Sequence, residues 1–445
     1  MAEAKGPKEW SEWGEWLSGG LHGRCRWRLP ILMLGMLLAR GRRTVTSWLR
    51  AAGVDTDYKS YYYLIAAVGH KTETLATRLF VLLLAHLPIG ERLVAALDDS
   101  PTRRYGPHVE GAGVHHNPTP GPADAKYVYG HIWVTLALIV RHALWGTIGL
   151  PLLARLYVRR KDVPKLPKYY RWPFQTKLEQ AVELIQWLAG LVQAAGKTLW
   201  IVADGFYAKR QVIHAVRQAQ ATLVSRLRKD ARLWTLPPPR KKGQRRKRGQ
   251  PRKYGTQRIS LAKRAGQKRG WESITCVLYG EEVTKKIKTF LATYRVAYGL
   301  IRVVIVQEPG GPQYFFSTDP NVSAKEILEV FADRAAIEQD FHDVKEVWGA
   351  GQQQVRHLWA NLGAWHLNLW TYTLVELWAW KQAKSRICDR RASPWDDAMR
   401  RPSHADRRKA LRRRILEAEY SAAAAVRPLA RKIRALVKTL LHLAT

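Results

Sequence analysis

The sequence predicts a mixed α/β protein in which a sheet is flanked by helices, a β-rich insertion interrupts the core, and helical regions lie at both ends. Between residues 91 and 224, apolar runs of strand length alternate with amphipathic helical segments, as in a mixed sheet. Short strand-like runs follow between residues 254 and 318, and helical periodicity dominates the first 90 residues. With 445 residues, 47% of them hydrophobic, the chain can bury a substantial core in several domains.

The charge of the chain points to nucleic acid. There are 74 Lys and Arg residues against 36 Asp and Glu residues, which gives a formal net charge of +38. A folded protein with this excess is typical of proteins that neutralise phosphates, and its binding should weaken steeply with salt. Binding to a membrane surface is the alternative.

The N-terminal 90 residues are expected to form a basic helical region. Residues 31–53 carry a helical apolar period with a break at the GRRT sequence, and the second short helix ends in Gly53. Residues 71–88 predict another helix, which Pro88 stops. We expect this region to bind DNA ends; purely structural packing is the alternative.

The predicted core begins with ERLVAALDDS, a short apolar strand expected to end in Asp98 and Asp99. Two β-type runs follow at residues 127–140 and 143–158, and an amphipathic helix at 176–196 is closed by Gly196. A buried strand then ends at Asp204 and leads into a further helix and strand. Acids at strand ends gather at one edge of such a sheet.

A change in composition marks the segment between Arg240 and Lys253. It contains nine basic residues and no acidic one, so we expect an exposed loop that contacts DNA phosphates. The DNA-binding residues expected there are Arg240, Lys241, Lys242, Arg245, Arg246, Lys247 and Arg248. Trp234 and Trp271 flank this loop and suit either base stacking or structural packing.

Cysteine usage and apolar tracts argue against several other classes of protein. The three cysteines lie far apart without CxxC spacing, so neither a zinc site nor a disulfide framework is expected, which suits a reducing cytoplasm. The N-terminus lacks the pattern of a signal peptide. Charged and amide residues interrupt both long apolar tracts, so no membrane span is expected.

A long helix is expected to begin with Ser323 as its N-cap and to carry Arg334, Glu338 and Lys345 on one face. At about 100° per residue these three side chains project within roughly 40° of one another. The acid could hold a cation while the bases hold a nucleic-acid backbone. A solvated helix face with an Arg–Glu pair is the alternative.

Three carboxylates could therefore meet: Asp98, Asp204 and Glu338. Converging acids repel one another unless divalent cations hold them. Two Mg²⁺ ions roughly 3.5–4 Å apart would activate a water or a 3′-hydroxyl and stabilise the leaving oxygen of a phosphodiester.

LDDS at 97–100, IVADGFY at 201–207 and the F-x2-R-x3-E-x6-K spacing at 331–345 together resemble the DDE transposases of bacterial insertion sequences. The resembling branch has a Tyr-x2-Arg-x3-Glu-x6-Lys signature, in which Phe331 here replaces the Tyr. The resemblance implies an RNase H-like core with a β-rich insertion. It covers about residues 90–380.

Carried over residue by residue, the resemblance makes Asp98, Asp204 and Glu338 the catalytic metal ligands for Mg²⁺, with Mn²⁺ as a substitute. Arg334 and Lys345 would contact DNA phosphates near the cleaved end. Either Asp98 or Asp99 could be the first ligand; the family's Asp-x-Ser/Thr tendency, with Ser100, favours Asp98. The resemblance also implies a cytoplasmic bacterial protein, associated with the nucleoid when it is bound to DNA.

The resulting expectation is a cut-and-paste transposase that cleaves and joins strands at terminal inverted repeats. Its partners would be double-stranded DNA, as element ends and target, and a second copy of the chain in a homodimer; no membrane is expected. Two alternatives stay open, a non-catalytic DNA-binding protein and a nuclease that cleaves without joining. The expected regions are a helical DNA-binding region at 1–90, the first part of the catalytic core at 91–224, the basic loop and β-rich insertion at 225–320, the end of the core at 321–383, and a basic helical tail at 384–445.

Overall fold

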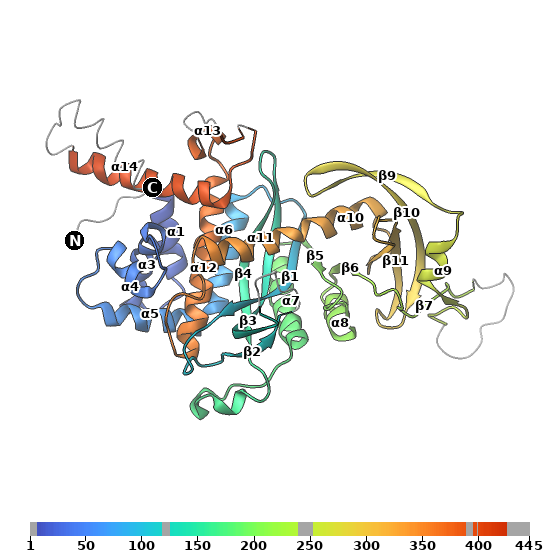
Figure 1. Cartoon of the computed structure of the whole chain (residues 1–445), viewed down its shortest axis with the longest axis horizontal. Helices are drawn as coiled ribbons and strands as arrows, with labels where there is room; N and C mark the ends of the chain where they lie inside the picture. The colour runs from blue at the N-terminus through green and yellow to red at the C-terminus, as the bar shows by residue number, and fades with distance from the viewer. Residues whose placement is uncertain (1–6, 118–124, 239–251, 389–394, 398, 425–445) are drawn as a thin grey trace.

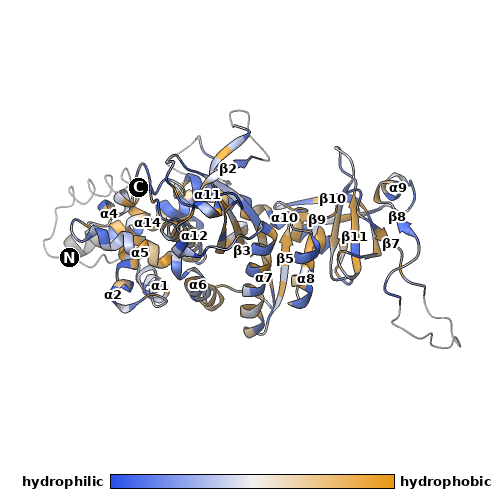
Figure 2. Cartoon of the chain, turned by 90° about the horizontal axis from the view of Figure 1, so that it is seen from below, coloured by the Kyte–Doolittle hydropathy of each residue, from blue (hydrophilic) through white to orange (hydrophobic). Residues whose placement is uncertain are grey.

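A computed structural model describes residues 7–117, 125–238, 252–388, 395–397 and 399–424. In these ranges twelve strands form one mixed sheet, which carries helices on both faces (Figure 1). The predicted mixed α/β class is therefore confirmed. Hydrophobic segments concentrate along central strands such as β5 and β11 (Figure 2), as expected for strands covered on both sides.

The core of the sheet has the strand order β4-β3-β1-β5-β6. β3 is antiparallel to both β1 and β4, whereas β1, β5 and β6 are parallel to one another. This combination is consistent with the RNase H-like fold that the sequence predicts. Its elements are β1 (Arg92–Arg103), β2 (Gly113–His116), β3 (Tyr127–His142), β4 (Gly146–Tyr157), α7 (Lys177–Ala194), β5 (Thr198–Ala203), α8 (Arg210–Gln218) and β6 (Thr222–Arg226).

β1 does not end at the two aspartates, so the sequence-based end of this strand is wrong. Its parallel pairing with β5 stops at Leu97 and Ala203, but its antiparallel pairing with β3 continues to Arg103. The reason is that β3 is 16 residues long and offers a partner beyond the last residue of β5. Asp98 and Asp99 therefore lie inside a strand, and their side chains must point to opposite faces of the sheet.

Two hydrophobic clusters identify these faces. Ala96 of β1 and Val202 of β5 pack with Phe331 and Ile337 of the late helices. Leu97 and the other odd-numbered core positions of β1 belong to the larger cluster, which includes the apolar side of α7. By strand alternation, Asp98 continues the row of Ala96 and Asp99 continues the row of Leu97.

The β-rich insertion extends the same sheet, because β12 pairs antiparallel with β6. Its elements are β7 (Leu233–Trp234), β8 (Arg258–Ile259), α9 (Leu261–Gly266), β9 (Glu272–Leu278), β10 (Glu281–Tyr294), β11 (Gly299–Val306) and β12 (Gln313–Ser317). The short helix α9 is not expected from the sequence, since Leu261 is its only buried residue and no apolar period marks it.

The late helix begins as the sequence predicts and then breaks. Ser323 and Glu326 form a capping box at the start of α10 (Ala324–Asp333). The single helix expected here is interrupted at Arg334, and α11 runs from Ala335 to Glu346. At the break the N–H of Arg334 donates to the carbonyl oxygen of Phe331, a three-residue step that tightens the turn.

α12 (Leu358–Ala379) is almost completely buried and joins the N-terminal helices to the core. One hydrophobic cluster extends from Trp10 to Ile415, so the core continues across the expected boundary at residue 90. None of the described helices combines the length and apolarity needed to cross a membrane. The remaining helices are α1 (Lys8–Ser18), α2 (Gly23–Arg26), α3 (Arg28–Leu38), α4 (Val45–Ala51), α5 (Tyr58–His70), α6 (Thr72–His86), α13 (Lys384–Ile387) and α14 (His404–Ala424).

Candidate active site

Asp98 lies on the sheet face that α11 covers. Its Oδ1 accepts the N–H of Asp99 at 2.8 Å, and its Oδ2 accepts Nη1 of Arg334 at 2.6 Å. Its side chain is only 19% exposed. Burial raises the pKa of Asp98 to about 7, although the Arg334 charge acts in the opposite direction. An ionised Asp98 therefore needs a cation beside it.

Asp204 follows the last residue of β5 and is fixed by the turn after it. Its Oδ1 accepts the N–H of Phe206 at 2.9 Å and that of Tyr207 at 3.4 Å. Its carbonyl oxygen accepts the hydroxyl of Ser225 on β6 at 2.9 Å. Burial raises its pKa, and the two backbone N–H groups and Arg334 oppose the shift. Because Leu97 pairs with Ala203, Asp98 and Asp204 follow paired positions on neighbouring strands.

Glu338 belongs to the same cluster through Arg334. Nη2 of Arg334 donates to Oε1 of Glu338 at 2.6 Å, one helical turn away. The guanidinium therefore bridges Asp98 and Glu338, and it is 15% exposed whereas the glutamate side chain is 57% exposed. Nε of Arg334 is buried without a hydrogen-bond partner among the described residues.

Lys345 also faces β1, as the helical spacing predicts. Its ammonium donates to the hydroxyl of Ser100 at 2.6 Å, and Ser100 lies two residues after Asp98 on the same strand face. Burial lowers the pKa of Lys345 to about 8. Arg334 and Lys345 therefore do not belong to a solvated helix face, whereas Glu338 on the same stripe is exposed.

Asp99 has a different environment on the opposite face. Its Oδ2 accepts Nζ of Lys177, the first residue of α7, at 2.6 Å, and its Oδ1 accepts the hydroxyl of Tyr207 at 2.7 Å. The sequence does not predict the contacts of Lys177 and Tyr207 with Asp99. These two residues lie 78 and 108 positions further along the chain, and no local pattern joins them to Asp99. Both of its oxygens are thus occupied by protein donors.

Phe331, which stands where the related signature has Tyr, is a core residue. It is 8% exposed and packs edge-on against Phe315, with 4.9 Å between the ring centroids. Its ring lies in the same cluster as Ala96 and Val202, and Cζ of Arg334 is 5.6 Å from the ring centroid. The position thus serves packing under the site.

Residues 17–277 match a family model described as DDE superfamily endonuclease, and this match covers more than half of the 445 residues. The chain belongs to the DDE superfamily of endonucleases. No curated protein matched it in a sequence search. The match contains Asp98 and Asp204 but ends before α11, so it does not test the roles of Glu338, Arg334 and Lys345.

DDE endonucleases act on DNA and generally use divalent metal ions. In the described part of this endonuclease, no three His, Cys, Asp or Glu side chains are already arranged as a metal-binding group. The donor chemistry nevertheless fits a hard cation, because carboxylate oxygens are the preferred ligands of Mg²⁺. The Arg334 guanidinium lies between Asp98 and Glu338 as the positive charge that compensates them.

The remaining candidate DNA contacts fall in two groups. Arg240, Lys241, Lys242, Arg245, Arg246, Lys247 and Arg248 fall outside the described residues. Trp234 and Trp271 are both partly buried, with Arg295 5.0 Å from the first ring centroid and Lys288 4.7 Å from the second. At least one face of each ring is thus already covered, which favours the packing alternative.

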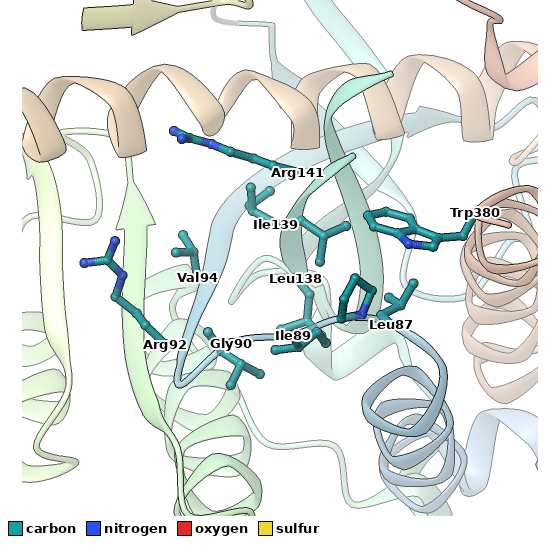
Figure 3. Close-up of a pocket in the computed structure, with 12 residues that line it drawn as sticks. Leu87, Ile89, Gly90, Arg92, Val94, Leu138, Ile139, Arg141 and Trp380 are labelled. Carbon is teal, nitrogen blue, oxygen red and sulfur yellow. The ribbon is translucent and has the colours of Figure 1, made fainter. Parts of the chain in front are cut away.

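A pocket of about 230 Å³ lies at the other end of β1 (Figure 3). Arg92, Val94, Arg141 and Trp380 are among its lining residues. Val94 is four residues from Asp98, about 13 Å along an extended strand. The pocket is therefore separate from the acids. Arg92 pairs with Glu326 and Arg141 pairs with Asp333, so the charges of both pocket arginines are compensated.

Proposed function

We propose that this DDE endonuclease is a transposase that cleaves and joins DNA strands at the ends of an insertion sequence, with Asp98, Asp204 and Glu338 as its metal ligands. The observation that carries the proposal is the Arg334 bridge between Asp98 and Glu338 on the sheet face that α11 covers. Nothing in a purely structural surface helix requires a buried guanidinium between two acids that lie 240 residues apart in the sequence.

The three acidic residues of the proposed site differ in burial and in how firmly they are held. Asp98 and Asp204 are desolvated and fixed by backbone hydrogen bonds, which suits ligands that must not move during the reaction. Two divalent ions, Mg²⁺ or the substitute Mn²⁺, would supply activation of a water or a 3′-hydroxyl and stabilisation of the leaving oxygen. Glu338, the most exposed of the three, completes the ligand set from α11.

Arg334 and Lys345 serve as the phosphate-binding cations in this proposal. Arg334 neutralises Asp98 and Glu338 in the free protein, and it can turn to a DNA phosphate when the acids have another cation. A guanidinium binds phosphate oxygens in a bidentate manner, whereas the Lys345 ammonium acts as a point charge. We further propose that two copies of the chain form a homodimer in the DNA complex, one for each element end.

The experiment compares Asp98→Asn, Asp204→Asn and Glu338→Gln with Glu346→Gln, a matched control on an exposed position of the same helix. Each purified variant is incubated with element-end DNA and Mg²⁺ or Mn²⁺, and nicked and joined products are scored. We expect cleavage to fall by roughly a hundredfold or more in the three triad variants, as when one group of a preorganised site is lost. DNA binding and the control should stay near wild type.

The outcomes distinguish the possible activities. Cleavage at a near wild-type rate in any triad variant removes that residue from the ligand set. Cleavage without joined products by the wild-type protein would indicate a nuclease, and binding without cleavage would indicate a DNA-binding protein derived from a transposase.

A further inference from the structure

A second group of cations lies away from the acids, where α14 crosses the end of α3 and the end of α11. It surrounds a pocket of about 200 Å³, which we call the arginine pocket. The pocket volume exceeds the roughly 30 Å³ occupied by one water molecule, so it admits a group of several atoms. Its five cations are Arg40, Arg43, Arg408, Lys409 and Arg412, and its other lining residues are Gly41, Val347 and Ala405.

Among the residues that the structure describes, these five cations have no acidic partner. Within the described ranges none of them takes part in an ion pair, whereas Arg334 beside the acids and both arginines of the pocket in Figure 3 do. Arg408 is 8% exposed, and its Nε has no hydrogen-bond partner in the described part of the chain. Nε and Nη1 of Arg43 and Nε of Arg412 are likewise buried and unpaired among the described residues.

The cations also repel one another. Burial and the charges of Arg43 and Arg412 lower the pKa of Arg408 to about 9. The pKa of Arg412 is also lowered, first by burial and then by the charges of Arg40 and Arg43. Concentrated positive charge in a partly desolvated site favours an anion that replaces the missing partners.

Arg408 has a structural role as well. Its Nη2 donates to the carbonyl oxygens of Leu37 and Ala39 at 3.1 Å, and it thereby satisfies the C-terminal end of α3. This accounts for one of the five cations. Arg40, Lys409 and Arg412 have no such hydrogen bond to the backbone in the described residues, so helix capping does not explain why they converge.

The pocket is joined to the helix that carries Glu338. Arg408 reaches the carbonyl oxygen of Val347, two residues after Lys345, and the backbone N–H of Arg43 donates to the side chain of Gln352 at 2.9 Å. Gly349 has φ +67°, and a Cβ there would lie 2.6 Å from Cγ of Arg43. The pocket and the end of α11 are therefore packed as one unit.

We propose that the arginine pocket binds a phosphate group, and that the backbone of the bound DNA supplies it. Guanidinium groups match phosphate oxygens in charge and in hydrogen-bond geometry. The choice of DNA as the source rests on the proposed function, whereas phosphate binding itself does not. The pocket would then add a DNA contact fixed relative to the triad but distinct from it.

The test uses the full-length protein without divalent metal. The variant is Arg40→Gln with Arg412→Gln, which leaves the capping residue Arg408 in place. The matched control is Arg42→Gln with Arg414→Gln, two exposed cations on the same loop and the same helix that do not line the pocket. Thermal unfolding is measured with inorganic phosphate and, at equal ionic strength, with chloride.

We expect phosphate to raise the Tm of the wild type and of the control above the chloride value, as a ligand specific to the folded state does. The Arg40/Arg412 double variant should lose this rise. For duplex DNA, its slope of log affinity against log salt should be smaller than that of the control by about 0.9 for each lost phosphate contact.

A phosphate-dependent rise without a change in the DNA slope would support the site and identify free phosphate rather than DNA as its ligand. If the double variant and the control respond alike in both measurements, the pocket does not bind phosphate. Neither result depends on strand cleavage, so a failure here is distinguishable from a failure of the catalytic proposal.

Discussion

Asp98 and Asp99 are neighbours in the chain but face opposite sides of the sheet, and this alternation gives them different surroundings. Asp98 meets Arg334 from α11, whereas Asp99 is held by Lys177 and Tyr207. The sequence leaves both residues open as the first metal ligand. The geometry favours Asp98, because only the Asp98 side chain points to the sheet face where Arg334 joins it to Glu338.

This difference predicts opposite effects of two isosteric changes. Asp98→Asn should abolish cleavage yet leave the unfolding free energy unchanged or higher, since burial already penalises the charged form of this carboxylate. Asp99→Asn should cost about 1–3 kcal/mol of stability, because the amide keeps an acceptor for only one of Lys177 and Tyr207 and no charge for the lysine, while cleavage stays within about tenfold of wild type. Chemical denaturation and the cleavage assay measure the two quantities. The reverse pattern would move the ligand to Asp99.

Lys345 supplies a second residue-scale prediction. Its ammonium is disfavoured by burial, which lowers its pKa to about 8, so the charge serves something other than stability. Lys345→Met should therefore reduce cleavage more than about tenfold while the Tm stays constant or rises. The same substitution at Lys325, an exposed lysine of α10, is the control. Equal cleavage by both variants would show that Lys345 does not act on the substrate.

At the scale of elements, α11 is fixed by a buried polar network with α12 and α14. The hydroxyl of Tyr372 donates to Oδ1 of Asp340 at 2.9 Å, and Glu376 accepts from Arg407 at 2.8 Å and also contacts His404. Asp340 is 1% exposed, and its Oδ2 has no partner among the described residues. Burial raises its pKa well above the ordinary range, so the protonated form is favoured in the folded protein.

A pH dependence of stability follows from this carboxyl. Because its pKa is higher in the folded than in the unfolded protein, its stabilising contribution is complete below the unfolded pKa of about 3.9 and is lost as pH rises towards the folded value. Asp340→Asn removes the titration and keeps an acceptor for Tyr372. The stability of the wild type relative to this variant should fall by up to about 1.4 kcal/mol per pH unit above pH 4. Urea unfolding of both proteins at several pH values measures this. Parallel curves would show that Asp340 ionises normally.

The same elements show what a sequence can and cannot predict. Ser323 as N-cap, Gly196 after α7 and the strand before Asp204 depend on neighbouring residues, and all are found as predicted. The end of β1 and the break at Arg334 are set by partners distant in sequence, β3 and the acids of the site. No local pattern encodes such partners, and the contacts of Asp99 were missed for the same reason.

At the scale of the whole molecule, the N-terminal helices and the catalytic core are not independent bodies. α5 packs extensively on α12, and Cβ atoms on Gly69 and Gly363 would each lie within 2 Å of a backbone oxygen of the other helix. The two helices therefore meet backbone to backbone. The sequence predicts a helical DNA-binding region at residues 1–90, but its composition does not show which core helix these helices pack against. Any DNA contact made by this region is thus held in a fixed relation to the sheet.

Gly363→Leu should separate these helices and unfold the core rather than release a stable head domain. Overpacking a close backbone contact typically costs about 1–3 kcal/mol or more, since the backbone cannot move aside. Limited proteolysis and thermal unfolding would show one cooperative transition at a lower temperature. Two transitions, with the 91–383 core surviving, would show that the head folds separately.

We expect that removal of the basic segment between Arg240 and Lys253 leaves this arrangement undisturbed. The residues on either side are already joined, because the N–H of Gly255 donates to the carbonyl oxygen of Thr235 at 2.9 Å and β7 pairs with β8. Deletion of 240–253 removes nine cations and no acid from a chain of net charge +38.

For this deletion variant we expect an unchanged Tm, weaker binding to duplex DNA, and a slope of log affinity against log salt that is smaller by about 0.9 for each lost phosphate contact. Replacement by a Gly/Ser segment of equal length is the control for loop length. If the Gly/Ser protein binds DNA with the wild-type slope, the nine cations do not touch the phosphates and their charge serves another purpose.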